Sequence, residues 1–577
     1  MDFLPMTAEE MRQRGWRQLD VLLITGDAYV DHPSFGVPLL GRVLEHEGFR
    51  VGILAQPDWR DPESFRGMGR PRLMVGVASG AMDSMVNHYT AAKKLRHNDA
   101  YTPGGRIGAR PNRAVIAYTA AVKAAFPGIF VVIGGLEASL RRLAHYDYWD
   151  DKVRRSVLVD SKADLLIYGM GEKPLVEIAR RLAKGEAPKS LTDVRNTAIM
   201  AGSVPANALV LPSFEEVSSD TAAYNLAFRL SVQASGEQVL AQAHGGRWVL
   251  INPPAAPLTT SELDAVYALP FQRRPHPSYR EPIPACTQIQ FSITSHRGCG
   301  GGCAFCAIVY HQGRSIQSRS PESILREAAE LVKHSDFRGT ITDIGGPTAN
   351  MYGCRCQPPS TDCHRMSCLW PTLCPHFQIS EAGANLLARA RKLSGVRHLF
   401  VSSGVRCDLL FQQPRYLQEL LTHHVGGLLK VAPETLSTPV ATVMHKPPPE
   451  LFERFLCTFR DTNKRLGLKR GIVPYLIAGH PGSTLNDMVE TALFLKRHHL
   501  KVEQVQEFTP TPGTLATCLY YTGRDPFTGK AIHIPRSPRE RRLQKALLLW
   551  HLPEQRAAIR EALRLCHRET AGAQLLH

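Results

Sequence analysis

Long apolar runs are missing from this sequence of 577 residues. A helix that crosses a membrane needs about 20 consecutive apolar residues, and no stretch of the chain approaches that length. The first ten residues, up to Glu10, lack the basic region and the apolar core of a secretory signal. The sequence therefore argues against a membrane protein, and we expect a cytoplasmic one.

Cysteine is too scarce for a disulfide scaffold, with 13 residues in the whole chain. In a cytoplasmic protein, clustered cysteines indicate metal binding or catalysis instead. Eight of the 13 cysteines lie between Cys299 and Cys374. No internal repeat with a period of about 20–50 residues is visible, so a solenoid is not expected.

The composition is that of a soluble globular protein, with 44% hydrophobic and 21% charged residues. The formal net charge of +17 predicts a basic surface. Such a surface attracts nucleic acid, acidic partners and anionic cofactors alike, so it does not choose among them. A basic surface that is merely solvated fits the charge equally well.

The N-terminal part, residues 1–251, alternates short apolar runs with stretches of helical spacing. This alternation predicts a doubly wound α/β domain with a parallel sheet. Glycines follow several of the runs, either because a ligand approaches the backbone there or because the chain turns tightly. The predicted strands are 19–25, 73–78, 129–133 and 165–168, and the glycines are Gly26, Gly80, Gly134, Gly135, Gly169 and Gly171.

Prolines are dense from 252 to 284, which predicts a linker between two domains. From 285 to 535 a second α/β series follows, with a helix beginning at Ser320 and Pro321. About six strand–helix units fit a full or partial β/α barrel. Residues 536–577 are basic and helical in pattern. The predicted strands of the barrel are 288–293, 340–344, 398–402, 427–432, 472–478 and 502–508.

Cys299, Cys303 and Cys306 follow the first predicted barrel strand with the spacing Cys-x3-Cys-x2-Cys. Thiolates are soft ligands that select zinc, copper(I) or iron–sulfur clusters. Three cysteines are one fewer than the four that normally complete a [4Fe–4S] cluster, so one iron would be open to another ligand. On spacing alone, a zinc site with a distant fourth ligand remains an alternative.

This cysteine pattern resembles the signature of the radical S-adenosylmethionine (SAM) superfamily. Further motifs, in the order found in radical methylthiotransferases and their relatives, support the resemblance. Residues 343–352 and the cysteine-rich insertion 353–376 also resemble the YgiQ family of radical SAM proteins. The motifs lie at 343–348, 402–403, 429–436, 443–447, 475–484 and 508–514.

The resemblance implies a [4Fe–4S] cluster on Cys299, Cys303 and Cys306 that cleaves SAM to a 5′-deoxyadenosyl radical for hydrogen abstraction. It also implies a one-electron donor of the flavodoxin or ferredoxin type, and it identifies no substrate. Proline replaces the family's glutamate at position 347, so backbone carbonyls would have to meet the amino group of SAM. The residues implied in SAM binding are Gly345, Gly346, Ser403 and Glu434.

Two other functions stay open at this point. A methylthiotransferase-like enzyme acting on tRNA or rRNA fits the barrel motifs, although no appended RNA-binding β-barrel is visible. A non-catalytic iron–sulfur protein for RNA binding or electron transfer fits the basic charge, but the missing fourth cysteine and the SAM motifs argue against it.

A second cysteine group lies in the insertion 353–376. Five thiols within this short, proline-rich loop predict a second metal, either an auxiliary iron–sulfur cluster or a structural zinc. Free thiols are the alternative. The candidate ligands are Cys356, Cys363, Cys368 and Cys374.

Enzymes related by this resemblance often carry a cobalamin-binding domain before the barrel, and the predicted N-terminal fold agrees with one. The usual cobalt-ligand motif is Asp-x-His-x-x-Gly, whereas this chain has Asp31 directly followed by His32. One spacing error moves the imidazole off its target, so His32 is a poor cobalt ligand. Cobalamin binding is left open.

Overall fold

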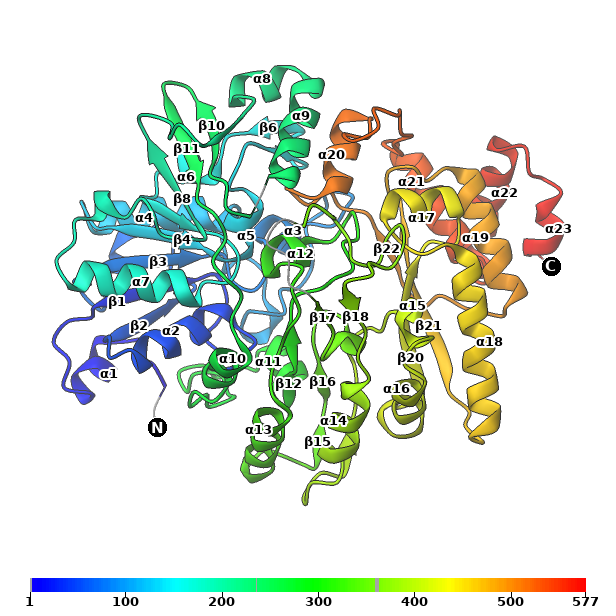
Figure 1. The fold of residues 1–577 in the computed structure, drawn as a ribbon, viewed down its shortest axis with the longest axis horizontal. Helices are drawn as coiled ribbons and strands as arrows, with labels where there is room; N and C mark the ends of the chain where they lie inside the picture. The colour runs from blue at the N-terminus through cyan, green and yellow to red at the C-terminus, as the bar shows by residue number, and fades with distance from the viewer. Residues whose placement is uncertain (1–2, 235, 358–362, 577) are drawn as a thin grey trace.

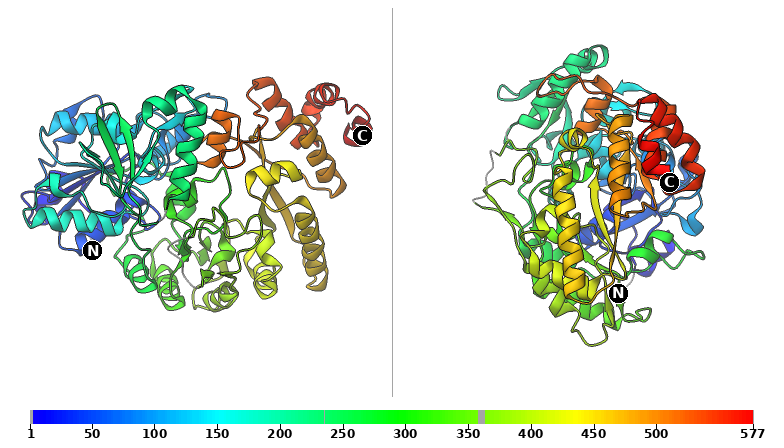
Figure 2. Two further views of the ribbon diagram at one scale, coloured as in Figure 1. Left: turned by 45° about the horizontal axis from the view of Figure 1, so that its top comes forward. Right: turned by 90° about the vertical axis from the view of Figure 1, so that its right-hand side faces the viewer.

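The structure, a computed structural model, describes residues 3–234, 236–357 and 363–576. An N-terminal α/β domain and a barrel-like domain lie side by side, with the two ends of the chain at opposite ends of the molecule (Figures 1 and 2). Within the described residues, none of the helices combines the length and apolar character that crossing a bilayer requires. The domain boundaries at 251, 284 and 535 stay a prediction.

The N-terminal domain is built on a sheet whose first five strands are parallel, in the order β2-β1-β3-β4-β7. Four of these strands coincide with the predicted apolar runs, which confirms the doubly wound fold. The fifth, at the edge of the sheet, was not predicted. The strands are β1 (Val21–Thr25), β2 (Val51–Ala55), β3 (Met74–Ala78), β4 (Val131–Gly134) and β7 (Leu165–Ile167).

Helices cover both faces of this sheet. Helices α2 (Gly36–His46) and α7 (Glu172–Ala183) bury one apolar stripe each on one face, while α4 (Ala114–Ala125) lies on the other (Figure 1). Beyond β7 the sheet continues with mostly antiparallel pairing, in the order β8-β11-β10-β9. These strands are β8 (Thr197–Ala201), β9 (Leu209–Leu211), β10 (Leu240–His244) and β11 (Arg247–Ile251).

The second domain is a partial β/α barrel whose neighbouring strands are parallel. An isolated parallel bridge between Val405 and Val431 joins the two halves of the strand series. The predicted barrel is therefore confirmed in its partial form. Its strands are β12 (Ser292–Thr294), β15 (Thr340–Ile341), β16 (Asp343–Gly345), β19 (His398–Leu399), β20 (Leu428–Glu434), β21 (Gly471–Ala478) and β22 (Val505–Glu507).

The first barrel strand was predicted at 288–293, and this is wrong for most of the segment. Residues Pro284–Ile289 form helix α11, and β12 begins only at Ser292. Pro284 occupies the first turn of α11, where its fixed φ and missing N–H are tolerated. The alternation that predicted a strand is thus overridden by a helix start four residues earlier.

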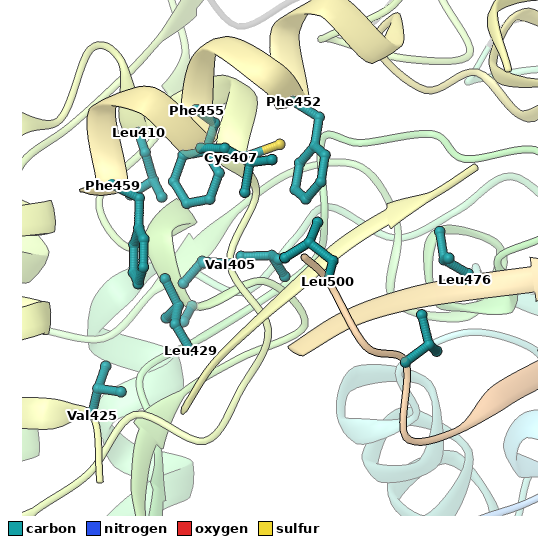
Figure 3. Packing of buried hydrophobic residues seen from close by; sticks show 14 of the residues in the cluster. Val405, Cys407, Leu410, Val425, Leu429, Phe452, Phe455, Phe459, Leu476 and Leu500 are labelled. Carbon is teal, nitrogen blue, oxygen red and sulfur yellow. The ribbon is translucent and has the colours of Figure 1, made fainter. Parts of the chain in front are cut away.

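A three-phenylalanine stripe anchors the outer layer of the barrel. Phe452, Phe455 and Phe459 lie on one face of α18 (Pro449–Arg465) and are fully or almost fully buried. Figure 3 shows them facing Val405 and Leu429. Their spacing of three and four residues is what a helix needs to present one apolar face to a sheet.

The C-terminal extension is helical, as predicted, and packs on the barrel through α19 (Leu485–Arg497). Gln544 of α21 also binds the loop that precedes α19, because its amide accepts from the Gly479 N–H at 2.9 Å and donates to the Ser483 carbonyl at 3.0 Å. The extension comprises α21 (Pro538–Leu548), α22 (Arg556–Leu565) and α23 (Ala571–Leu576).

Candidate active site

Cys299, Cys303 and Cys306 share one loop at the carboxyl end of β12. The short strand β13 (His296–Arg297) precedes the loop and pairs with β14 (Gln317–Ser318). Helix α12 (Ala307–Gln312) follows the loop. The N–H of Cys299 donates to the Gly313 carbonyl at 3.2 Å, so the base of the loop is closed. This is the edge of a β/α barrel where active sites lie.

The three thiols lie close enough to interact electrostatically. Burial, followed by the charges of Cys303 and Cys299, raises the pKa of the Cys306 thiol to about 12. Three thiolates gathered on one loop repel one another, so a cationic centre would stabilise their charge. Nowhere in the described part of the chain do three His, Cys, Asp or Glu side chains sit as they would around a single metal ion. A [4Fe–4S] cluster presents a separate iron to each thiolate, so it suits this donor set better.

Arg406 supplies positive charge at the same thiols, and the sequence analysis missed it. Its Nη1 donates to the Cys303 sulfur at 3.5 Å, and its Nε and Nη2 hold the carboxylate of Asp408. Although burial lowers it, Asp408 and Cys303 bring the pKa of Arg406 well above its ordinary value. The guanidinium therefore stays charged beside the loop. No spacing pattern in the sequence points to it.

The glycines between the first two cysteines make room for the insertion. A Cβ on Gly302 would lie 2.2 Å from the Met366 carbonyl oxygen, and one on Gly300 would lie 3.0 Å from the Phe377 ring. The Ser367 hydroxyl donates to the Gly301 carbonyl at 2.7 Å. The insertion thus packs directly on the loop that carries Cys299, Cys303 and Cys306 (the cluster loop). The sequence did not predict this contact.

Gly345, Gly346 and Ser403, predicted to bind SAM, are brought together at the neighbouring strand ends. The Ser403 hydroxyl donates to Asp343, and a Cβ on Gly345 would lie 2.4 Å from the Ser403 hydroxyl oxygen. A Cβ on Gly346 would lie 2.6 Å from the His296 ring. Both glycines are therefore required by packing. The Gly345 carbonyl accepts from the N–H and the hydroxyl of Ser295 at 2.7 and 2.9 Å, so of the two carbonyls only that of Gly346 is left for a ligand at the strand end.

Glu434, the fourth residue predicted to bind SAM, lies at the end of β20 beside the cluster loop. Its charge acts on the Cys306 thiol. Burial raises the pKa of the Glu434 carboxyl, and the charges of Lys446 and Arg406 oppose that rise. Its φ of +68° coincides with a register shift between Val431 and Glu434. The bulge turns this side chain toward the cysteines.

A cavity of about 510 Å³ lies between the two domains, where the parallel strands of the N-terminal sheet end. His296, Arg297 and His311 line it from the barrel side. Burial lowers the pKa of both histidines to about 4, so they are neutral near pH 7. Of the glycines singled out in the sequence, Gly80, Gly134, Gly135, Gly169 and Gly171 line the cavity and Gly26 does not.

His32, the doubtful cobalt ligand, is fully buried and does not line this cavity. Its Nδ1 accepts from the Ser34 N–H at 3.0 Å, and its Nε2 lies 2.9 Å from Nη1 of Arg273. Both ring nitrogens are therefore engaged within the protein.

Comparison with known proteins agrees with this architecture. Residues 3–292 match the family model "Radical SAM N-terminal", residues 293–495 match "Radical SAM superfamily", and residues 503–572 match a domain of unknown function, DUF3362. The chain is thus a radical SAM enzyme.

A UPF0313 protein of Geobacter sulfurreducens is 58% identical over 100% of this chain and 97% of its own. The UPF0313 protein YgiQ of Salmonella typhimurium is 45% identical over 97% of this chain and 87% of its own. The chain belongs to the YgiQ (UPF0313) family.

Among solved structures, the cobalamin-dependent SAM radical enzyme OxsB, with aqua-cobalamin bound, resembles this chain with a TM-score of 0.51 and 11% identity. The match covers 98% of this chain and 73% of OxsB. At this level of identity the likeness concerns the fold alone, and the order of an N-terminal domain followed by a radical SAM barrel rests on the two family models.

Proposed function

We propose that Cys299, Cys303 and Cys306 hold a [4Fe–4S] cluster at which SAM is cleaved reductively for hydrogen abstraction from a substrate. The observation that carries this proposal is the meeting of three thiols on one barrel loop, with the guanidinium of Arg406 3.5 Å from the Cys303 sulfur. Three protein ligands leave one iron for an exchangeable partner. When bound, the cluster supplies the electron that splits SAM into methionine and a 5′-deoxyadenosyl radical.

The residues around the loop have separate tasks in this proposal. Arg406 offsets the negative charge of the ligated cluster. Gly346 offers its backbone carbonyl to the amino group of SAM, since Pro347 stands where related enzymes use a glutamate, whereas the Gly345 carbonyl is already engaged by Ser295. Ser403 and Glu434 hold polar parts of SAM. An external one-electron donor of the flavodoxin or ferredoxin type reduces the cluster.

The interdomain cavity is the proposed place of the substrate. Gly346 and Pro347 of the SAM motif line it together with His296, and the Thr348 hydroxyl lies 3.6 Å from the Cys299 sulfur. A cavity of about 510 Å³ falls in the range of small-molecule sites. Cobalamin is the alternative occupant, supported by the fold likeness to OxsB but without His32 as a ligand. Retention of hydroxocobalamin by the full-length protein through gel filtration would assign the cavity to it.

Formation of 5′-deoxyadenosine tests the function. Anaerobic protein with its iron–sulfur centres reconstituted is reduced with dithionite in the presence of SAM, and 5′-deoxyadenosine and methionine are quantified. We expect both products from the wild type and neither from Cys303→Ala. Cys457→Ala is the matched control, because Cys457 is exposed on α18 away from the site. Equal yields from wild type and Cys303→Ala, or no product from the wild type, would contradict the proposal.

A further inference from the structure

The cysteine-rich insertion is closed into a loop by a short antiparallel ladder. Cys356 on β17 (Arg355–Cys356) pairs with Phe377 on β18 (Phe377–Gln378). The Gln357 N–H donates to the His376 carbonyl at 2.8 Å, and the Phe377 N–H donates to the Cys374 carbonyl at 2.9 Å. The chain therefore returns Cys374 to the neighbourhood of Cys356.

The thiol of Cys368 interacts with three other thiols of the insertion. Its electrostatic neighbours include the thiols of Cys363, Cys374 and Cys356. The Cys374 N–H donates to the Cys368 carbonyl at 2.7 Å, which fixes these two residues relative to each other. The fifth thiol of the insertion, Cys354, is 2% exposed in an apolar cluster with Met351 and has no thiol among its electrostatic neighbours. Cys354 shares that apolar cluster with Cys374 and Cys368, but it takes no part in the electrostatic interaction among the other four thiols.

The part of the insertion from residue 365 to residue 372 is held in one shape although it has no regular secondary structure. The guanidinium of Arg365 donates to the carbonyls of Ser367, Trp370 and Thr372. The Ser367 hydroxyl accepts from the N–H groups of Leu369 and Trp370 at 3.0 and 2.9 Å. Trp370 stacks on His445 with ring centroids 4.0 Å apart. A preformed loop lowers the entropy cost of gathering ligands.

Charge at the four thiols also suits a ligated metal centre. Arg314 donates to the Cys363 carbonyl at 2.9 Å, and its positive charge favours the thiolate of Cys368. Four thiolates around an iron–sulfur core carry net negative charge, which a neighbouring guanidinium stabilises.

We infer that Cys356, Cys363, Cys368 and Cys374 ligate a second iron–sulfur cluster, of the [4Fe–4S] type, beside the SAM-cleaving one. A single zinc ion would need all four sulfurs about 2.3 Å from one point. Among the described residues, no three His, Cys, Asp or Glu side chains are grouped as they would be around a single metal ion. A cluster holds each thiolate on its own iron and accepts wider spacing. With four protein ligands the second cluster has no open iron, so it does not bind SAM.

The two cysteine groups are in direct contact through the backbone and through apolar packing. The Cys368 N–H donates to the Gly300 carbonyl at 2.8 Å, and Cys368 contributes with Cys299 to one buried apolar cluster. The second cluster therefore sits against the loop that holds the first.

Removing the first site isolates the second. The variant Cys299→Ala/Cys303→Ala/Cys306→Ala of the full chain is reconstituted anaerobically with iron and sulfide, and both are measured per chain. We expect about four irons and four sulfides in this variant, against about eight of each in the wild type. The electron paramagnetic resonance signal of the reduced variant should not change on adding SAM. Adding Cys368→Ala and Cys374→Ala to the variant should abolish the remaining iron.

The matched control is Cys354→Ala, which removes a buried thiol from the same insertion and should keep the full iron content. A second comparison keeps the test decisive if the triple variant is unstable: Cys368→Ser/Cys374→Ser alone should fall from about eight irons to about four. An iron-free triple variant that is folded, zinc in place of iron, or wild-type iron content in Cys368→Ser/Cys374→Ser would overturn the inference. None of these outcomes depends on SAM cleavage, so the proposed function is tested separately.

Discussion

Arg297 and Glu172 form a buried ion pair that joins the cluster loop to the N-terminal domain. Their side chains are 5% and 6% exposed. Arg297 lies two residues before Cys299, and Glu172 begins α7. The Arg297 Nε also donates to the Tyr267 hydroxyl at 3.2 Å. The N-terminal domain therefore helps to position Cys299, a ligand of the proposed cluster.

Glu172→Gln should destabilise the protein and loosen the cluster. Removing one charge of a buried pair leaves the other uncompensated, which costs about 3–5 kcal/mol. We expect a lower free energy of unfolding in urea and a faster loss of iron to a chelator. Glu322→Gln is the control, because the pair of Glu322 with Arg389 is exposed and such pairs contribute about 0–1 kcal/mol. Equal effects of the two substitutions would contradict this role.

Arg406→Met should slow 5′-deoxyadenosine formation by about 10–100-fold. A hydrogen bond to a charged group is worth about 1.5–3 kcal/mol, and each 1.4 kcal/mol corresponds to about tenfold in rate. Loss of the positive charge should also make the cluster harder to reduce, so its midpoint potential becomes more negative. Arg406→Lys should recover part of the potential but not the two-pronged contact with Asp408. An unchanged potential in Arg406→Met would show that the guanidinium has no electrostatic role.

Gly302→Ala should disrupt the contact between the cluster loop and the insertion. Gly302 has a φ of +57°, and a Cβ there would meet the Met366 carbonyl oxygen at 2.2 Å. Gly523 has a φ of +68° with no atom within 4 Å of the added Cβ, so Gly523→Ala measures backbone strain alone. We expect about 1–2 kcal/mol for that strain and a further 1–3 kcal/mol or so for the clash. Denaturant unfolding of the two variants measures the difference.

The stability of the protein should fall as the pH falls from about 6.5 to about 4. Burial lowers the pKa of His480 to about 4, so in this window the unfolded chain binds a proton that the folded protein excludes. His480→Phe keeps an aromatic ring between Phe305 and Phe508. Between about pH 7 and pH 4 it should lose about 3 kcal/mol less stability than the wild type. His423→Phe, at an exposed ring, should follow the wild-type profile, and identical slopes for all three would refute the assignment.

The barrel could be predicted because its signals are local, and the three cysteines of the proposed cluster were singled out for the same reason. Apolar runs that end in glycine mark parallel strands, and Cys299, Cys303 and Cys306 keep a short spacing on one loop. The second cysteine group, Cys356 to Cys374, could be singled out as well, because its members lie close together in the sequence. The helix at Pro284–Ile289 was missed because a proline at a helix start outweighed a short alternating pattern.

Other parts of the site depend on contacts between distant segments. Arg406 reaches Cys303 only through the fold, and Glu172 meets Arg297 across two domains. The two partners of such a contact lie far apart in the sequence, so neither periodicity nor local spacing predicts it.

The close packing of Gly302 against Met366 ties two separate stretches of sequence to one evolutionary constraint. A relative that loses the insertion is freed from the need for glycine at this position of its cysteine loop. A relative that keeps the insertion can accept a side chain there only if the loop around Met366 shifts. Changes at these two positions should therefore occur together across the family. They would distinguish members whose cysteine loop is covered by the insertion from members that lack it.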